Sequence, residues 1–166
     1  MMQRMLLGLL SSMFLLISAQ AADFKWMDDK GEIYTLSEAY KGQPVIVHFW
    51  ASWCPPCVAE MPEMAIWLKE HSNVNVLPVS LDNNLETAQH FLQQNQIAMP
   101  ALLTDNSQSG RMGVRGLPTT MLIDQHGKVI TGRVGMQDWQ KKSWTNQILA
   151  LFSQERIAQN TPPVLH

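Results

Sequence analysis

The sequence contains only two cysteines in its 166 residues, and these two, Cys54 and Cys57, are three positions apart. Exported proteins that depend on disulfides for stability place them across longer loops, where closing the loop stabilises the fold more. A second cysteine pair is absent and the five histidines are scattered, whereas a structural zinc site needs about four ligands. No metal site is therefore expected, and the pair is interpreted as reactive.

Clusters of basic residues are absent as well. Lys and Arg number 12 against 14 Asp and Glu, which gives the chain a formal charge of −2. Without a basic stretch, nucleic acid and anionic membrane surfaces are not expected as partners. The length suits a single domain, and the sequence shows no internal repeat or low-complexity block.

Apolar residues form only one long run, which lies at the N-terminus. Arg4 precedes the run Met5–Ile17, and Ser18–Ala21 follows it with an Ala-x-Ala ending. This order predicts a secretory signal peptide over residues 1–21 that is cleaved after Ala21. The alternative is an uncleaved membrane anchor, although the run is shorter than the roughly 20 residues that span a bilayer. Either interpretation predicts an exported protein.

The rest of the chain alternates strand and helix patterns. We expect one folded domain over residues 22–155, followed by a disordered tail over 156–166 that includes Pro162 and Pro163. Hydrophobic periodicity and turn residues predict a hairpin at Phe24–Leu36, a helical turn at Ser37–Gly42, strands at Val45–Trp50, Val74–Leu81, Ala101–Leu103, Thr119–Ile123 and Lys128–Val134, and helices from Pro55 to about His71, at Asn84–Asn95, at Ser107–Met112 and at Gln137–Phe152.

This order of elements predicts an α/β fold with a central mixed sheet and helices on both faces, because parallel crossovers come first and an antiparallel hairpin comes last. The β-branched and aromatic run Val45–Trp50 is expected to be a buried central strand. In the helix that starts at Pro55, the spacing of Val58, Met61, Ala65 and Leu68 predicts the apolar face.

The cysteines lie where the predicted central strand gives way to this helix. Unpaired N–H groups and the helix dipole at that point favour a thiolate at Cys54, and Cys57 is expected to be more shielded. The Cys54 thiolate would attack a partner disulfide, and Cys57 would then attack Cys54 and release the partner. The same steps run backwards oxidise a dithiol, so the motif leaves the direction open.

Two segments carry a family resemblance. Phe49–Cys57 with Glu60-Met61-Pro62 resembles the active site of the TlpA-like thioredoxin family, whose members include ResA-like and DsbE-like proteins, and Gly116–Asp124 resembles the family's segment with a cis-proline. Phe24–Gly42 is similar to its added N-terminal β-hairpin. The resemblance spans Phe24–Phe152 and implies a thioredoxin-like fold. The family includes periplasmic and membrane-tethered disulfide reductases, several of which serve cytochrome c maturation.

For individual residues, the resemblance implies that the Leu117–Pro118 bond is cis, faces the cysteines, pairs with a bound partner and keeps metals off the thiols. The alternative is an ordinary turn proline. Glu60 matches an acidic residue near the cysteine pair, where a carboxyl whose pKa is raised by burial exchanges protons with the thiols. The alternative is a solvated carboxylate in the first turn of the helix.

His48 departs from the family pattern, because thioredoxin has a buried Asp at this point and TlpA-like proteins often have Asn. A histidine beneath Cys57 would relay protons and titrate near neutral pH. The alternative is a buried, hydrogen-bonded histidine with no part in catalysis. Of the two tryptophans beside the motif, Trp50 is expected in the core, and Trp53 is expected to be partly exposed and to give partners an aromatic surface.

The leading functional hypothesis is a periplasmic disulfide reductase that acts on protein partners, needs no cofactor and is kept reduced by a membrane electron donor of the DsbD/CcdA type. This hypothesis rests on the resemblance. A dithiol oxidase that inserts disulfides, a thiol-based copper metallochaperone and a peroxidase are the alternatives. The reduction potential of the Cys54–Cys57 pair separates an oxidase from a reductase.

Overall fold

The computed structural model describes residues 23–160, so the signal peptide expected at 1–21 lies outside the described residues. The elements are β1 Lys25–Met27, β2 Ile33–Thr35, α1 Leu36–Ala39, β3 Val45–Trp50, α2 Pro55–Glu70, β4 Val76–Ser80, α3 Leu85–Gln94, β5 Leu102–Leu103, α4 Asn106–Arg111, β6 Thr119–Ile123, β7 Val129–Val134 and α5 Lys142–Asn160. Among these residues, no helix is both long and apolar enough to cross a membrane.

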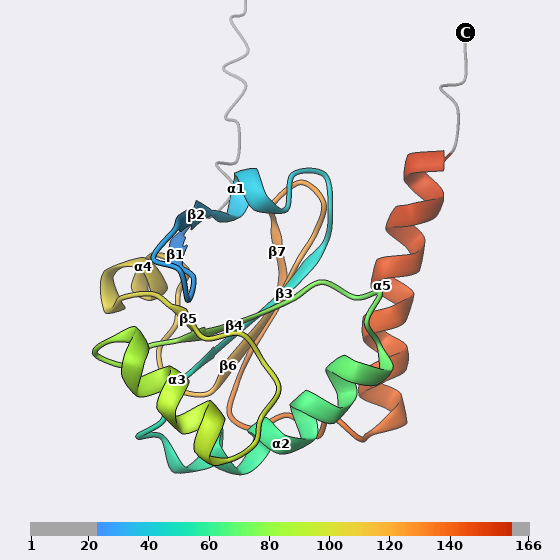
Figure 1. Ribbon diagram of the computed structural model, residues 1–166. Helices are drawn as coiled ribbons and strands as arrows, with labels where there is room; N and C mark the ends of the chain where they lie inside the picture. Colours follow the sequence, from blue (N-terminus) through green and yellow to red (C-terminus); the bar gives the residue numbers. More distant parts are fainter. Residues whose placement is uncertain (1–22, 161–166) are drawn as a thin grey trace, which may run out of the picture.

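All seven strands form one mixed sheet in the order β2-β1-β5-β4-β3-β6-β7 (Figure 1). Strand β3 pairs in parallel with β4 and antiparallel with β6, and the hairpin of β1 and β2 extends the sheet beyond β5. All six residues of β3 are buried, as the β-branched and aromatic run predicts. The predicted α/β fold with an added N-terminal hairpin is therefore confirmed.

Side chains of β3 alternate between two hydrophobic cores on opposite faces of the sheet. Val45, Val47 and Phe49 belong to a core that also contains Leu36 of α1. Ile46 and Trp50 belong to the other core, to which α2, α3 and α5 contribute. By this alternation His48, which lies between Ile46 and Trp50 in sequence, points to the face that α2 covers.

The buried face of α2 differs from the predicted one. Its buried residues are Cys57, Glu60, Met61, Met64 and Trp67, whereas Val58, Ala65 and Leu68 are only partly buried beside them. The periodicity of apolar residues misplaced the face by about one position, because it left out a cysteine and a glutamate that the fold buries. Pro62 lies within the helix and is exposed. Its ring nitrogen cannot donate a helical hydrogen bond, and this interruption is on the side of the helix that faces water.

The last helix also differs from the prediction, since α5 begins at Lys142 instead of Gln137. Segment 137–141 contributes its polar groups to α2: the Gln137 N–H and the Trp139 indole N–H both donate to the Glu60 carboxyl group. The helix then runs to Asn160, past the expected domain boundary at 155 and into the segment expected to be a tail. Residues 161–166 lie outside the described part.

Candidate active site

Cys54 and Cys57 are joined by a disulfide at the start of α2, with their Cα atoms 5.3 Å apart. Cys54 is the N-cap residue of the helix, and its sulfur accepts the Cys57 N–H at 3.4 Å. Cys54 keeps 5% of its surface exposed and Cys57 keeps none. After reduction, the unpaired N–H groups and the dipole of a 16-residue helix favour a thiolate at Cys54. The structure therefore makes Cys54 the accessible sulfur and Cys57 the shielded one.

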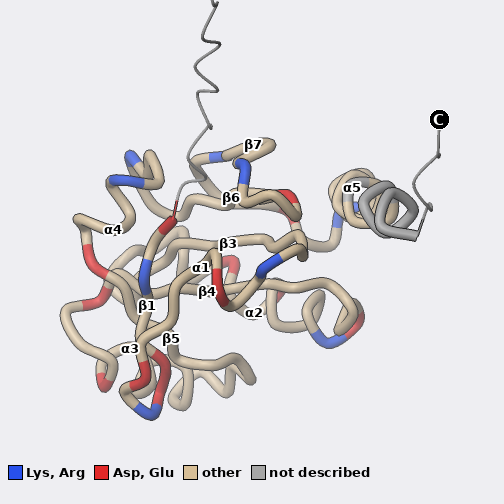
Figure 2. The backbone as a smooth tube through the Cα atoms, turned by 90° about the horizontal axis from the view of Figure 1, so that it is seen from above, with Lys and Arg blue, Asp and Glu red and all other residues tan. Residues whose placement is uncertain are grey.

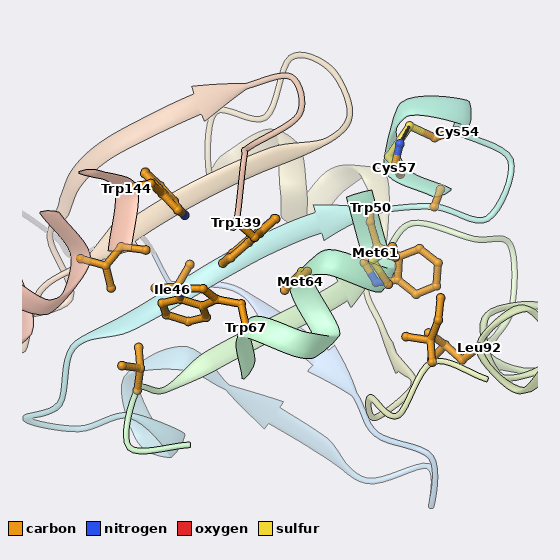
Figure 3. Close-up of a cluster of buried hydrophobic side chains, with 14 of the residues drawn as sticks. Ile46, Trp50, Cys54, Cys57, Met61, Met64, Trp67, Leu92, Trp139 and Trp144 are labelled. Carbon is orange, nitrogen blue, oxygen red and sulfur yellow. Dashed lines mark hydrogen bonds between the residues drawn. A yellow bond between two sulfur atoms is a disulfide. The ribbon is translucent and has the colours of Figure 1, made fainter. Parts of the chain in front are cut away.

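From Cys57 inward, α2 carries its buried side chains into the core between helix and sheet. Figure 3 shows the disulfide at one end of this cluster, with Met61, Met64 and Trp67 following along the helix and Trp139 beside them. Trp50 is fully buried in the same core, whereas Trp53 on the loop before Cys54 is 64% exposed. The predicted burial of Trp50 and the predicted exposure of Trp53 are confirmed, and Trp53 gives the site an exposed aromatic ring.

Asp82 holds the loop that leads into Cys54. Its carboxylate accepts hydrogen bonds from the Ser52 backbone N–H at 3.2 Å, from the Ser52 hydroxyl at 2.7 Å and from the Ser80 hydroxyl at 2.7 Å. It is only 5% exposed. Asp82 is not among the site residues predicted from the sequence. A usable signal was its place directly beyond a predicted parallel strand, because the carboxyl ends of β3 and β4 lie at the same edge, with Trp50 opposite Ser80.

The Leu117–Pro118 peptide bond is cis, as the resemblance implies. It lies directly before β6, whose first residue Thr119 is opposite Phe49 of β3, so the loop ends beside the strand that leads to the cysteines. The Gly135 N–H donates to the Pro118 carbonyl at 2.8 Å, and the Thr119 hydroxyl donates to the Gly116 carbonyl at 2.6 Å. A cavity of about 640 Å³ is lined by both Cys54 and Leu117.

Glu60 lies one helical turn after Cys57 on the same face of α2 and is 1% exposed, a spacing that makes the two side chains neighbours. Burial raises the pKa of Glu60 to about 7, and the charge of Glu63 acts in the same direction. The hydrogen bonds from Trp139 at 3.2 Å and Gln137 at 3.0 Å oppose this pKa shift. The structure is not that of a solvated first-turn carboxylate, and Glu60 changes its charge near neutral pH.

His48 is fully buried and lies against Glu60. Its Nδ1 is 3.0 Å from the Thr120 hydroxyl on the neighbouring strand. Its Nε2 is 3.3 Å from Glu60 Oε1, which is an ion-pair distance, but the contact lacks the geometry of a hydrogen bond. This nitrogen therefore has no hydrogen-bond partner among the described residues. The Trp139 ring packs edge-on against the imidazole, with the ring centroids 5.9 Å apart.

Burial lowers the pKa of His48 to about 3. The expectation that His48 titrates near neutral pH is therefore wrong, because full desolvation disfavours the imidazolium. Burial favours the neutral form of both side chains, so it lowers the pKa of His48 and raises the pKa of Glu60. Between about pH 3 and about pH 7 the pair consists of a neutral imidazole and a neutral carboxyl group, and above about pH 7 only Glu60 is charged.

The site combines an accessible sulfur at a helix start, a shielded sulfur one turn in, and a buried carboxyl group on the same helical face. The two sulfurs suit thiol–disulfide exchange, and a carboxyl group in this place is chemically able to exchange a proton with the inner thiol. Within residues 23–160, no group of three or more His, Cys, Asp and Glu side chains is placed to hold a metal ion. Asp82, Thr120, Gln137 and Trp139 are the parts of this site that the sequence analysis did not find.

Comparison with known proteins gives a consistent picture. The model of the AhpC/TSA family matches residues 17–131. Sporulation thiol-disulfide oxidoreductase A of Bacillus subtilis is 31% identical over 114 residues, which cover 64% of this chain and 69% of that protein. The thiol-disulfide oxidoreductase ResA of Geobacillus thermodenitrificans is 33% identical over 130 residues, 74% of this chain and 73% of that protein.

A solved structure agrees with these relatives. A Chlorobium tepidum protein assigned as a thiol:disulfide interchange protein DsbE has a TM-score of 0.68 and 34% identity, and the match covers 80% of this chain and 94% of that one. The resemblance to ResA-like and DsbE-like proteins, first drawn from two short motifs, thus holds over most of the folded chain.

Proposed function

We propose that this chain, which belongs to the AhpC/TSA family and is a thiol–disulfide oxidoreductase, works in the reducing direction. In this proposal it is a periplasmic disulfide reductase that acts on protein partners. Export through residues 1–21 and reduction by a membrane donor of the DsbD/CcdA type are parts of this proposal. Cytochrome c maturation is one process that such a reductase serves, by the resemblance described above.

The observation that carries the direction is the neutral His48 beside the inner half of the site. Strongly oxidising dithiol pairs owe their potential to a stabilised reduced form, and a cation near the sulfur is one way to stabilise a thiolate. His48 is the basic side chain on this face of β3, and burial keeps it uncharged. The group that does become charged near neutral pH is the Glu60 carboxyl, which disfavours a thiolate at Cys57. The surroundings therefore favour a reducing pair.

In the proposed cycle, the Cys54 thiolate attacks one sulfur of a partner disulfide and forms a mixed disulfide, and the other partner sulfur leaves as a thiolate that takes up a proton. The ionised Glu60 then accepts the proton of the Cys57 thiol. Cys57 attacks the sulfur of Cys54, the protein disulfide forms, and the second partner sulfur leaves. Two electrons pass from the protein dithiol to the partner.

Three residues have supporting roles in this proposal. The cis Leu117–Pro118 segment presents its backbone to the partner beside Cys54. Glu60 is the proton acceptor for Cys57, which has no exposed surface from which water could take the proton. His48 acts through Glu60 as a positioning residue, because Thr120 fixes one ring nitrogen and leaves the other against the carboxyl group.

The reduction potential of the Cys54–Cys57 pair tests the direction. Equilibration of the purified protein with dithiol buffers is expected to give a value on the order of −250 mV, in the range of thioredoxin. A value near about −120 mV would contradict the reductase and support the dithiol oxidase. Tight stoichiometric Cu(I) binding without insulin reduction would instead support the metallochaperone, and peroxide consumption would support the peroxidase.

A further inference from the structure

The cavity beside the reactive disulfide has one wall from each of the two loops of the site. Trp53, Pro55 and Pro56 come from the loop and helix start that carry Cys54, and Val114 to Leu117 come from the loop that carries the cis peptide bond. The volume of about 640 Å³ is enough for several side chains of an extended segment. Cys54 lies in this lining, so a segment that fills the cavity also meets the attacking sulfur.

One charged residue, Arg115, stands among the described residues that line this cavity. Arg115 is exposed, and it has no ion pair or hydrogen bond with any residue in the described part of the chain. Its neighbours on both sides are held in place. The Val114 N–H donates to the Ser109 carbonyl at 3.1 Å, and the Gly116 carbonyl accepts the Thr119 hydroxyl at 2.6 Å. The guanidinium group therefore extends from an anchored backbone and remains available for an external ligand.

The positive charge of Arg115 contrasts with the formal net charge of the whole chain, which is −2. Figure 2 shows two basic segments beside α4. Arg111 is in the last turn of α4, where a cation stabilises the helix dipole. Arg115 lies beyond the helix end and lines the cavity, so the dipole does not account for it. A locally positive wall next to an apolar one suits a segment that is both acidic and apolar.

We propose that Arg115 selects partner segments that carry a carboxylate side chain close to the cysteine that Cys54 attacks. The proposal rests on the reaction with protein partners described above and adds the chemistry of their recognised segment. Apolar residues of that segment lie against Trp53 and Leu117, and an Asp or Glu beside its cysteine pairs with the guanidinium, whose planar fork matches a carboxylate. An exposed pair of this kind changes the rate by about two- to fivefold, acts mainly on association and weakens with salt.

The test uses two synthetic peptides that differ only in having glutamate or lysine on both sides of a single cysteine. Each peptide is supplied as its mixed disulfide with thiopyridine. The Cys54 thiolate of the reduced protein attacks the peptide sulfur, and the released thiopyridone is followed by absorbance. Neutral thiopyridine is the leaving group in both peptides, so it adds no charge of its own. The glutamate peptide is expected to react about two- to fivefold faster at low salt, and this ratio should approach one at high salt.

Arg115→Gln is expected to abolish the preference, and Arg115→Glu is expected to reverse it. Arg111→Gln is the matched control, because it removes an exposed arginine four residues away that does not line the cavity, and it should leave the preference intact. Equal rates with both peptides for the unmodified protein, or a preference that survives Arg115→Gln, would overturn the proposal. A potential near the oxidising limit would refute the reductase direction alone, since these peptide rates do not depend on it.

Discussion

The two cysteines of one short motif lie in opposite surroundings. Cys54 follows the exposed Trp53 and lines a cavity together with Arg115, which has no ion pair or hydrogen bond with the described residues. Cys57 has no exposed surface and shares a helical face with a carboxyl group that titrates near neutral pH. The outer half is therefore equipped to meet a partner protein and the inner half to move a proton. The fold thus gives different tasks to two identical side chains that are three residues apart.

Removal of the Cys57 sulfur should have the largest effect on the reaction cycle. Cys57→Ser leaves Cys54 able to attack but removes the group that resolves the mixed disulfide, so insulin reduction should be lost and partner proteins should accumulate on Cys54. Mass spectrometry of bands trapped in non-reducing gels from the exported fraction checks this. The control is Cys54→Ser, which should trap none. Partners trapped equally well by Cys54→Ser would reverse the proposed order of attack.

Glu60→Gln should alter the pH dependence of stability in the oxidised protein. Because the pKa of Glu60 rises from 4.5 to about 7 on folding, the folded state holds a proton that the unfolded state has lost, and stability falls as pH rises through this interval. The shift corresponds to about 3 kcal/mol. Between pH 6.5 and 7, where His48 no longer opposes it, urea unfolding should show this fall in the wild-type protein and not in the variant. A wild-type-like decline between pH 6.5 and 7 would contradict the assignment.

His48 should contribute a dependence of stability on pH that is opposite in sign to that of Glu60, and His48→Asn should remove it. The pKa of His48 falls from 6.5 to about 3 on folding, so its contribution to stability is present above pH 6.5 and is lost as the pH falls toward 3. Between about pH 4.5 and 6.5 the slopes from His48 and Glu60 therefore oppose each other. Urea unfolding of His48→Asn should show a fall in stability with rising pH across this window, whereas Glu60→Gln should show a rise. Parallel slopes in the two variants would contradict the opposite pKa shifts of His48 and Glu60.

Asp82→Asn should have a smaller effect, confined to the outer half. The amide replaces one acceptor oxygen with a donor that faces the Ser52 or Ser80 groups, which should cost about 1–3 kcal/mol. The loop before Cys54 loosens, so the first attack on a peptide disulfide should slow while resolution by Cys57 does not. Stopped-flow rates of the two steps check this, with Ser52→Ala as a control that removes a single hydroxyl donor. Equal slowing of both steps would contradict a role limited to Cys54.

Much of this fold was predictable from the sequence, because strong local patterns agree with the tertiary structure. The run Val45–Trp50 is β-branched and aromatic and forms the central strand, and the two motif segments carried the family resemblance. The outer half of the site was predictable for the same reason, since Cys54, Trp53 and Pro118 lie within short motifs. Such motifs are contiguous in the chain and need no tertiary contact to be recognised.

The inner half was less predictable because long-range contacts create it. Trp139 and Gln137 reach Glu60 from nearly 80 positions away in the chain, and these contacts displace the start of α5, which periodicity placed too early. The pKa of His48 depends on complete burial, which the identity of the residue does not reveal. Asp82 and Thr120 meet their partners only because strand register places them there.

The most direct test of the division between the two halves is the rate of the resolving step as a function of pH. A mixed disulfide between Cys54 and a chromophoric thiol is formed, and release of the chromophore by Cys57 is followed between pH 5 and 9. The rate is expected to rise with an inflection near pH 7. Glu60→Gln should remove this inflection without changing the pH profile of the first attack by Cys54. An inflection near pH 7 that persists in the resolving step of Glu60→Gln would contradict this role of Glu60. A change that Glu60→Gln causes in the pH profile of the first attack would contradict it as well.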